Sequence, residues 1–198
     1  MGQYYKPLLI AEDGTRMTAY SHDYGNGLKL MEHSWVGNNF VNVVLQSLDC
    51  TPQRLAWIGD YANSAIEDDC DLGDGFVTDR DSFAELYESV WGEEAGDTAL
   101  IDKMQPEYRL SNKEADCFIV NLTKKCYIDM EKYVSENNKN GWCINPIPLL
   151  TSIGNGHGGG DYRGDDPNSD VGSWAFDKIY ITALRPGSME EIMYYFAE

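Results

Sequence analysis

The chain has 198 residues, of which 42% are hydrophobic and 12% aromatic, and its formal net charge is −18. This composition supports a folded core and excludes an extensively disordered protein, and we expect a single domain over residues 1–198. The strong negative charge argues against direct binding to nucleic-acid phosphates.

The chain has five cysteines, which is an odd number, and no two of them form a CxxC pair. The first residues are polar and mixed, unlike a secretory signal, and no apolar run approaches the roughly 20 residues that span a bilayer. These features predict reduced thiols in a cytoplasmic protein with no membrane partner. A disulfide between Cys117 and Cys126 is compatible with their positions around a predicted hairpin, but we do not expect one.

The first 60 residues are predicted to contain a hairpin, a helix and an interior strand. The hairpin strands span residues 4–11 and 16–21, the helix runs from an Asn38 or Asn39 cap to about Leu48, and the strand covers 54–59. Asparagine is a favoured N-cap residue, and the apolar run at 54–59 is typical of a strand buried on both faces.

Beyond residue 115 the patterns predict further strands and two helices. They give strands at 116–122 and 126–133 joined by a turn, a short proline-initiated helix at 145–150, a strand at 173–182 and a C-terminal helix from a capping box at 188–191. Trp57, Trp174 and Ile179 are expected in the core, and His33 is expected to be a hydrogen-bonded structural residue.

Most of the negative charge lies in one stretch of sequence. Residues 59–116 carry 17 acidic and 4 basic residues, whereas the rest of the chain carries 16 and 11. Asp81 is placed to cap a helix with Phe83, Leu86, Tyr87 and Val90 on its inward face. We therefore predict an α+β fold, with a mostly antiparallel sheet, flanking helices and a helical acidic insertion at 63–115, here called the acidic segment.

The acidic segment has two interpretations. It is either a solvated face that keeps the protein soluble, or a surface that competes with nucleic acid for a basic protein partner. Under the second interpretation, the candidate partner-binding residues are Glu67, Asp68, Asp69, Asp71, Asp74, Glu85, Glu88, Glu93 and Glu94.

A glycine-rich loop at 154–166 contains six glycines and three aspartates. Such a backbone can cradle a ligand, although the loop matches neither the Walker A nor the Rossmann pattern; a wide connector is the alternative. The candidate ligand-binding residues are Asn155, Gly158, Gly159, Gly160, Asp161, Arg163 and, in the next strand, Asp177.

The same loop offers oxygen ligands to a divalent cation. Asp161, Asp165 and Asp166 have the short spacing that suits Ca²⁺ or Mg²⁺, although the EF-hand pattern is missing and ordinary turn chemistry explains these residues equally well. No other cofactor is expected. Asp177 lies in an otherwise apolar run and, if it faces inward, needs a partner such as Arg163 or a loop N–H.

His157 is a weaker candidate for chemistry. It could form an acid–base pair with Asp161 or serve as the base for Cys143, but a lone loop histidine is usually solvated. No second signal supports catalysis, so no catalytic residue is assigned and we expect a binding protein rather than an enzyme.

Several motifs resemble a family of small, uncharacterised bacterial and phage proteins. They are MGQYY at the start, GLKLMEH at 27–33, GNGHGGGD at 154–161 and GSWAFD at 172–177. The resemblance implies that the relatives carry Arg at the position of His157 and Gly at the position of Phe176. Because a shared mechanism would not survive an Arg-to-His exchange, Asp161, Arg163 and Asp177 are the better site candidates.

Two functions follow as expectations. The first is a small acidic accessory protein of a bacterium or phage that binds a protein partner, as a phosphate-mimicking inhibitor of a host nucleic-acid-binding complex. The alternative is a ligand-binding protein or enzyme that uses the glycine-rich loop for a phosphorylated or sugar-like ligand with a divalent cation.

Overall fold

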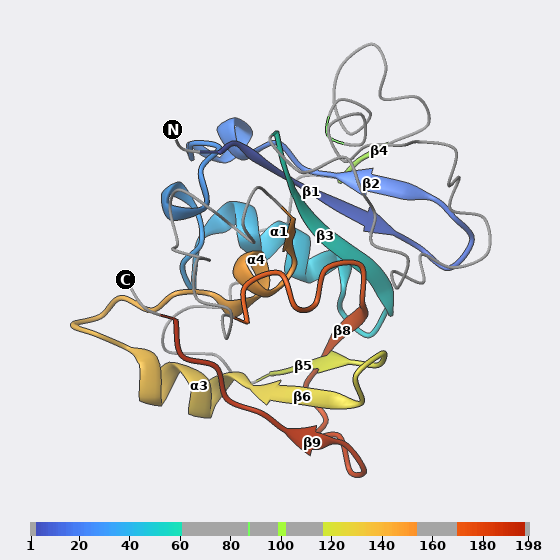
Figure 1. Ribbon diagram of the computed structural model, residues 1–198, viewed down its shortest axis with the longest axis vertical. Coiled ribbons are helices and arrows are strands. Elements are labelled where there is room, and N and C mark those ends of the chain that lie inside the picture. The colour runs from blue at the N-terminus through green and yellow to red at the C-terminus, as the bar shows by residue number, and fades with distance from the viewer. Residues whose placement is uncertain (1–2, 61–86, 88–98, 102–116, 154–169, 197–198) are drawn as a thin grey trace.

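The computed structural model describes residues 3–60, 87, 99–101, 117–153 and 170–196. Their strands form one mixed sheet in the order β4-β2-β1-β3-β8-β5-β6-β9, with β7 also paired to β3 (Figure 1). The strands are β1 (Tyr5–Ile10), β2 (Arg16–Thr18), β3 (Gln53–Gly59), β4 (Ala99–Leu100), β5 (Phe118–Asn121), β6 (Cys126–Asp129), β7 (Ser152–Ile153), β8 (Lys178–Thr182) and β9 (Glu190–Glu191).

Antiparallel pairings outnumber parallel ones among these strands, five to three. The helices are α1 (Asn39–Ser47), α3 (Met130–Asn137) and α4 (Pro146–Leu150), with short 3-10 helices at Ser21–Tyr24 and Leu30–Glu32. The predicted α+β class is therefore confirmed.

The centre of the sheet is the antiparallel pair β1 and β3, which is buried on both faces. Leu9 lies opposite Leu55, and these two side chains join Trp57 in the main core. Their chain neighbours point to the other face, because side chains alternate along a strand. This burial explains why the sequences of both strands are almost continuously apolar.

Helix α1 covers the Leu9 and Trp57 face of the sheet (Figure 1). Its N-cap is Asn38, whose side-chain oxygen accepts hydrogen bonds from the backbone N–H groups of Phe40 and Val41 at 2.9 and 3.2 Å. Phe40 packs edge-to-face on Trp57, with ring centres 6.0 Å apart. The predicted cap of this helix is confirmed, and the helix buries Phe40, Val43 and Val44.

The opposite face of β1 and β3 holds a smaller cluster. Tyr87 and Phe176 pack there against residues of the two strands, namely Leu8, Ile10, Ala56 and Ile58. Tyr87 has helical backbone and is buried, as predicted for that position of the acidic segment. The segment therefore contributes to the folded scaffold at this residue.

The predicted strand at 126–133 is correct only in its first half. Strand β6 ends at Asp129, whose side chain accepts a hydrogen bond from the Lys132 N–H at 3.2 Å and so caps α3. The apolar residues Met130, Tyr133 and Val134 then bury one face of that helix. A capping aspartate at the end of an alternating run thus changes the element from strand to helix.

The predicted strand at 173–182 is shorter than expected. Residues 171–176 form turns, and β8 begins only at Lys178. Gly172 and Phe176 both have positive φ, at 80° and 60°, which interrupts an extended strand. The left-handed conformation of Phe176 favours glycine, the residue that the resembled family is expected to carry there.

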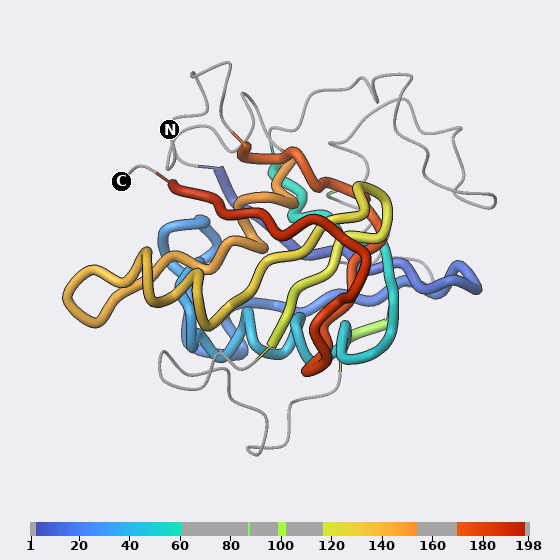
Figure 2. Tube along the Cα trace, turned by 90° about the horizontal axis from the view of Figure 1, so that it is seen from below, coloured from blue at the N-terminus to red at the C-terminus, as the bar shows by residue number. Residues whose placement is uncertain are grey.

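The predicted C-terminal helix is wrong. Residues 190–191 form β9, which pairs in parallel with β6, and the following residues extend beside it (Figures 1 and 2). The N–H of Ile192 donates to the Tyr127 carbonyl oxygen at 2.9 Å. The open edge of β6 satisfies the tail's backbone groups, and this gain outweighs the local capping-box preference.

Some of the remaining local predictions are confirmed and one is wrong. The structure confirms the N-terminal hairpin, the interior strand β3 and helix α4. The first turn of α4 contains the predicted prolines. Residues 99–100, which lie in the insertion that is predicted to be helical, instead form β4 beside β2. In the described part of the chain, no helix has the length and apolar character needed to cross a membrane.

Candidate functional site

Most of the predicted site residues lie outside the described residues. These are the loop candidates Asn155, Gly158, Gly159, Gly160, Asp161, Arg163, Asp165 and Asp166, together with His157 and the nine partner-binding candidates from Glu67 to Glu94. Asp177 is the exception and lies in the described part of the chain.

Asp177 lies beside β3, at the point where one edge of that strand stops pairing with one strand and begins to pair with another. The start of β3 pairs with β8 and its end pairs with β7. Between these pairings, the Phe176 N–H donates to the Leu55 carbonyl at 2.8 Å, and the Phe176 carbonyl accepts from the Arg54 guanidinium at 3.1 Å. The interruption at Phe176 therefore fixes the position of the Asp177 backbone.

The side chain of Asp177 is 13% exposed, and other side chains of the same chain contact it. Its carboxylate accepts a 2.7 Å hydrogen bond from the amide of Asn121, and the Lys124 ammonium lies 3.9 Å away. Burial raises the pKa of Asp177, while the Asn121 hydrogen bond and the Lys124 charge act in the opposite direction. Asn121 also accepts from the Lys124 N–H at 2.9 Å, so this set of residues holds the β5–β6 turn to the sheet.

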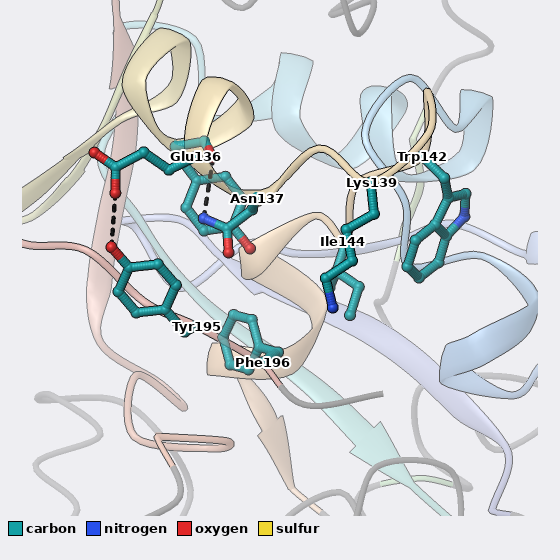
Figure 3. A pocket seen from close by; sticks show the side chains of 8 residues that line it. Glu136, Asn137, Lys139, Trp142, Ile144, Tyr195 and Phe196 are labelled. Atoms are coloured by element: carbon teal, nitrogen blue, oxygen red, sulfur yellow. Dashed lines mark hydrogen bonds between the residues drawn. The ribbon is translucent and has the colours of Figure 1, made fainter.

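A second candidate site is a pocket of about 150 Å³ beside α3 (Figure 3). It lies between this helix, the turn that follows it and the C-terminal tail, and we call it the α3–tail pocket. Its lining residues are Tyr133, Glu136, Asn137, Lys139, Trp142, Ile144, Tyr195 and Phe196. Aromatic rings and polar groups therefore share one small concave surface.

Helical spacing brings three of these side chains together. Tyr133, Glu136 and Asn137 lie at positions i, i+3 and i+4 of α3, which share one face of a helix. The Asn137 amide donates to the Tyr133 carbonyl at 3.0 Å and lies 3.7 Å from the sulfur of Met193 in the tail. These contacts fix the orientation of the amide at the pocket.

A tight turn positions Lys139 and Trp142. The backbone N–H and carbonyl of each residue bond to those of the other at 2.8 and 3.1 Å. The intervening Asn140 and Gly141 have φ angles of 57° and 88°, as a type I′ turn requires. Residues paired across such a turn project their side chains from the same face, and both side chains line the pocket in Figure 3.

The tail closes the other side of the pocket. The Tyr195 hydroxyl donates a 2.6 Å hydrogen bond to the Glu136 carboxylate, drawn as a dashed line in Figure 3. Phe196 stacks on Tyr194 with ring centres 6.2 Å apart, and the Tyr194 hydroxyl accepts from the indole N–H of buried Trp174 at 2.9 Å. The pocket wall formed by Phe196 is thus connected to the core.

The pocket residues were not among the sequence candidates. The Asn140–Gly141 dipeptide is a local signal for a type I′ turn and could have identified the opposed pair Lys139 and Trp142. The contribution of Tyr195 could not be found in this way, because the tail had been predicted as a helix.

His33 has the structural role that its sequence context predicts. It is fully buried; its Nε2 accepts from the Trp57 indole N–H at 3.1 Å, and its Nδ1 lies 3.1 Å from the Gly27 carbonyl oxygen. Burial lowers the pKa of His33 to about 4. The ring is therefore neutral, with its proton on Nδ1, and belongs to the core.

Cys117 and Cys126 are both free thiols. Among the described residues, no group of three or more His, Cys, Asp or Glu side chains is placed to hold a metal ion. Comparisons of this chain with protein-family models, curated proteins and solved structures found no match.

Proposed function

We propose that this chain is an acidic accessory protein that acts by binding a basic protein partner through its acidic segment. The observation that carries the proposal is the separation of charge between scaffold and segment. Residues 63–115 contain 15 acidic and 4 basic side chains, a net charge of −11. The other 145 residues contain 18 and 11, a net charge of −7.

This separation supports a binding role because solubility alone does not require it. A protein of this size is kept soluble by a modest net charge spread over its surface. Concentrated negative charge instead attracts a positive surface, raises the association rate and repels partners of like charge.

Two contacts support attachment of the acidic segment to the scaffold. Tyr87 packs on the β1–β3 face, and Ala99–Leu100 pairs in parallel with β2. Fixed points of this kind reduce the entropy that is lost when a charged stretch binds a partner.

The partner class that fits this chemistry is a nucleic-acid-binding protein of a bacterial cell. Its basic surface binds phosphates, and closely spaced carboxylates offer an alternative set of negative charges. The resemblance to bacterial and phage proteins and the reduced thiols expected in the cytoplasm are consistent with this role. Binding would inhibit the partner by competing with its nucleic acid.

The test is affinity capture from a bacterial lysate with a pair of charge-matched variants. The first variant neutralises four acids of the segment: Asp68→Asn, Asp69→Asn, Asp71→Asn and Asp74→Asn. The control neutralises four exposed acids of the scaffold: Asp13→Asn, Asp23→Asn, Glu131→Gln and Glu190→Gln. Both variants change the net charge by the same amount, so only the location of the charge differs.

We expect the segment variant to lose a captured protein that the control retains. That protein, once purified, should bind the wild-type chain in a salt-dependent manner, and double-stranded DNA should displace it. Equal losses in both variants would show that net charge alone is responsible and would overturn the proposal. Unchanged binding of the purified partner by a folded segment variant would overturn it as well.

A further inference from the structure

We infer that the α3–tail pocket binds one neutral saccharide unit, either a free sugar or a residue of a longer glycan. This inference concerns residues outside the acidic segment and does not depend on the proposed function. It rests on the charges, the aromatic surfaces and the size of the pocket.

The polar groups of the pocket favour an uncharged ligand that is rich in hydroxyl groups. Glu136 and Lys139 bring opposite charges to the same small site, so a ligand of either sign would be attracted by one and repelled by the other. A carboxylate accepts hydrogen bonds and an ammonium donates them, and the Asn137 amide offers its oxygen as an acceptor, because its nitrogen already contacts Tyr133 and Met193. Hydroxyl groups can satisfy all three, because each hydroxyl is both donor and acceptor.

The aromatic side chains provide the surface that the apolar face of a sugar ring needs. Trp142 is 39% exposed and Tyr195 is 68% exposed, although both are large rings that usually bury most of their area. The face of an aromatic ring carries partial negative charge, and the C–H groups on one side of a pyranose carry partial positive charge. Stacking on these rings would therefore complement hydrogen bonding at the polar groups.

The size of the pocket restricts the ligand to a small unit. Its volume of about 150 Å³ lies below the range of about 300–1,000 Å³ that is typical of sites for drug-sized molecules. One sugar ring suits this space, and further units of a chain would extend past the exposed rings into solvent.

The pocket is also pre-formed by contacts within the protein. The Tyr195–Glu136 hydrogen bond, the Asn140–Gly141 turn and the stacking of Phe196 on Tyr194 hold the lining residues in place. A site that is already ordered loses less conformational entropy when a ligand binds.

The test is ligand-observed NMR with neutral sugars and charged analogues. The neutral sugars are glucose, galactose, mannose and N-acetylglucosamine with their disaccharides, and the charged analogues are glucuronate and glucosamine. We expect saturable binding of at least one neutral sugar, and weaker binding of its charged analogue. A disaccharide that binds more tightly than its monosaccharide would identify a glycan chain as the source, and equal affinities would identify a free sugar.

Variants then locate the binding. Trp142→Ala and Tyr195→Ala should each reduce the affinity at least tenfold, and Tyr4→Ala, which removes an exposed aromatic ring outside the pocket, should leave it unchanged. Glu136→Gln tests the polar side of the pocket at constant size and should also weaken binding. Circular dichroism and thermal melting identify any variant that is unfolded, and the other variants then decide the question.

Three results would overturn the inference. They are no binding of any neutral sugar, equal binding of the charged analogues, or sugar binding that folded Trp142→Ala and Tyr195→Ala variants retain in full. Peptides that bind in a Trp142-dependent manner without any sugar binding would assign the pocket to a protein partner instead.

Discussion

The ammonium nitrogen of Lys6 lies 3.8 Å from the centre of the Tyr87 ring, although the two residues are 81 positions apart in the sequence. The same nitrogen lies 3.4 Å from the Tyr87 carbonyl oxygen. Both residues are more than nine-tenths buried. A buried ammonium must be compensated, and the ring and the carbonyl together compensate it while joining the acidic segment to β1.

This relationship predicts a measurable coupling between the two side chains. Lys6→Met keeps most of the aliphatic stem but removes the charge, and Tyr87→Leu removes the ring. We expect each to destabilise the protein, with a coupling free energy of about 0.5–2 kcal/mol in a double-mutant cycle measured by urea unfolding. Lys125→Met, at an exposed position, changes the net charge equally and should have an effect below about 0.5 kcal/mol. A coupling free energy of zero would show that the Lys6 ammonium and the Tyr87 ring do not stabilise each other.

His33 predicts a specific dependence of stability on pH. Burial lowers its pKa to about 4 in the folded protein, whereas an exposed histidine in the unfolded chain titrates near 6.5. Between these values the unfolded state binds more protons, so this residue makes stability fall as the pH drops from about 6.5 to about 4. The total contribution is on the order of 3 kcal/mol, since each pKa unit corresponds to about 1.4 kcal/mol.

His33→Gln isolates this contribution. Glutamine can accept from the Trp57 indole and donate to the Gly27 carbonyl, as the neutral imidazole does, but it does not titrate. We expect the difference in unfolding free energy between wild type and variant to vary between pH 4 and 6.5 and to be constant from pH 7 to 8. Urea unfolding across this pH range measures it. A constant difference throughout would show that His33 does not titrate on unfolding as predicted.

The sequence predicted those elements whose local signals agree with their tertiary environment. The Asn38 cap, the prolines of α4 and the apolar run of β3 each favour the structure that packing also favours. The tail shows the opposite case. The sequence from Ser188 favours a helix start. In the folded chain, however, residues 190–191 lie beside the edge of β6 and pair with it as a strand.

The α3–tail pocket could not be predicted for a related reason. Its hydrogen bond between Glu136 and Tyr195 joins residues 59 positions apart, and it exists only because the tail pairs with β6. The Asn140–Gly141 turn is the one part with a local signal. Asp177 was expected to need a partner such as Arg163 or a loop N–H if it faced inward, but Asn121 carries no sequence feature that identifies it as the partner observed.

Two substitutions of Asp177 separate a structural role from a ligand-binding one. Asp177→Asn retains an oxygen that can accept from the Asn121 amide and loses the attraction of the carboxylate to the Lys124 ammonium at 3.9 Å and to the Arg54 guanidinium, so we expect a change below about 1 kcal/mol. Asp177→Ala leaves the buried Asn121 amide without this acceptor and should destabilise by about 1–3 kcal/mol. Urea unfolding of both variants checks the difference. Equal, small effects would mean that the hydrogen bond does not stabilise the fold, and a ligand-binding role would then be favoured.

The cysteines predict an order of chemical reactivity. Cys50 is exposed, whereas Cys126 and Cys143 are buried, and burial raises the pKa of each of these two thiols to about 11. At pH 8 a thiol of that pKa is about 0.1% thiolate, which is the reactive form. The pKa of Cys50 is also raised, first by its hydrogen bond with Asp49, but its exposure leaves it open to attack.

We therefore expect iodoacetamide at pH 8 to alkylate Cys50 at least a hundredfold faster than Cys126 or Cys143 in the folded protein. Peptide mass spectrometry at successive times measures the three rates separately. In urea the three thiols should react at similar rates, which controls for any effect of neighbouring sequence. Labelling of Cys126 or Cys143 within tenfold of the Cys50 rate under native conditions would mean that the core opens on the timescale of the reaction. That result would contradict the protection expected from their packing against the sheet.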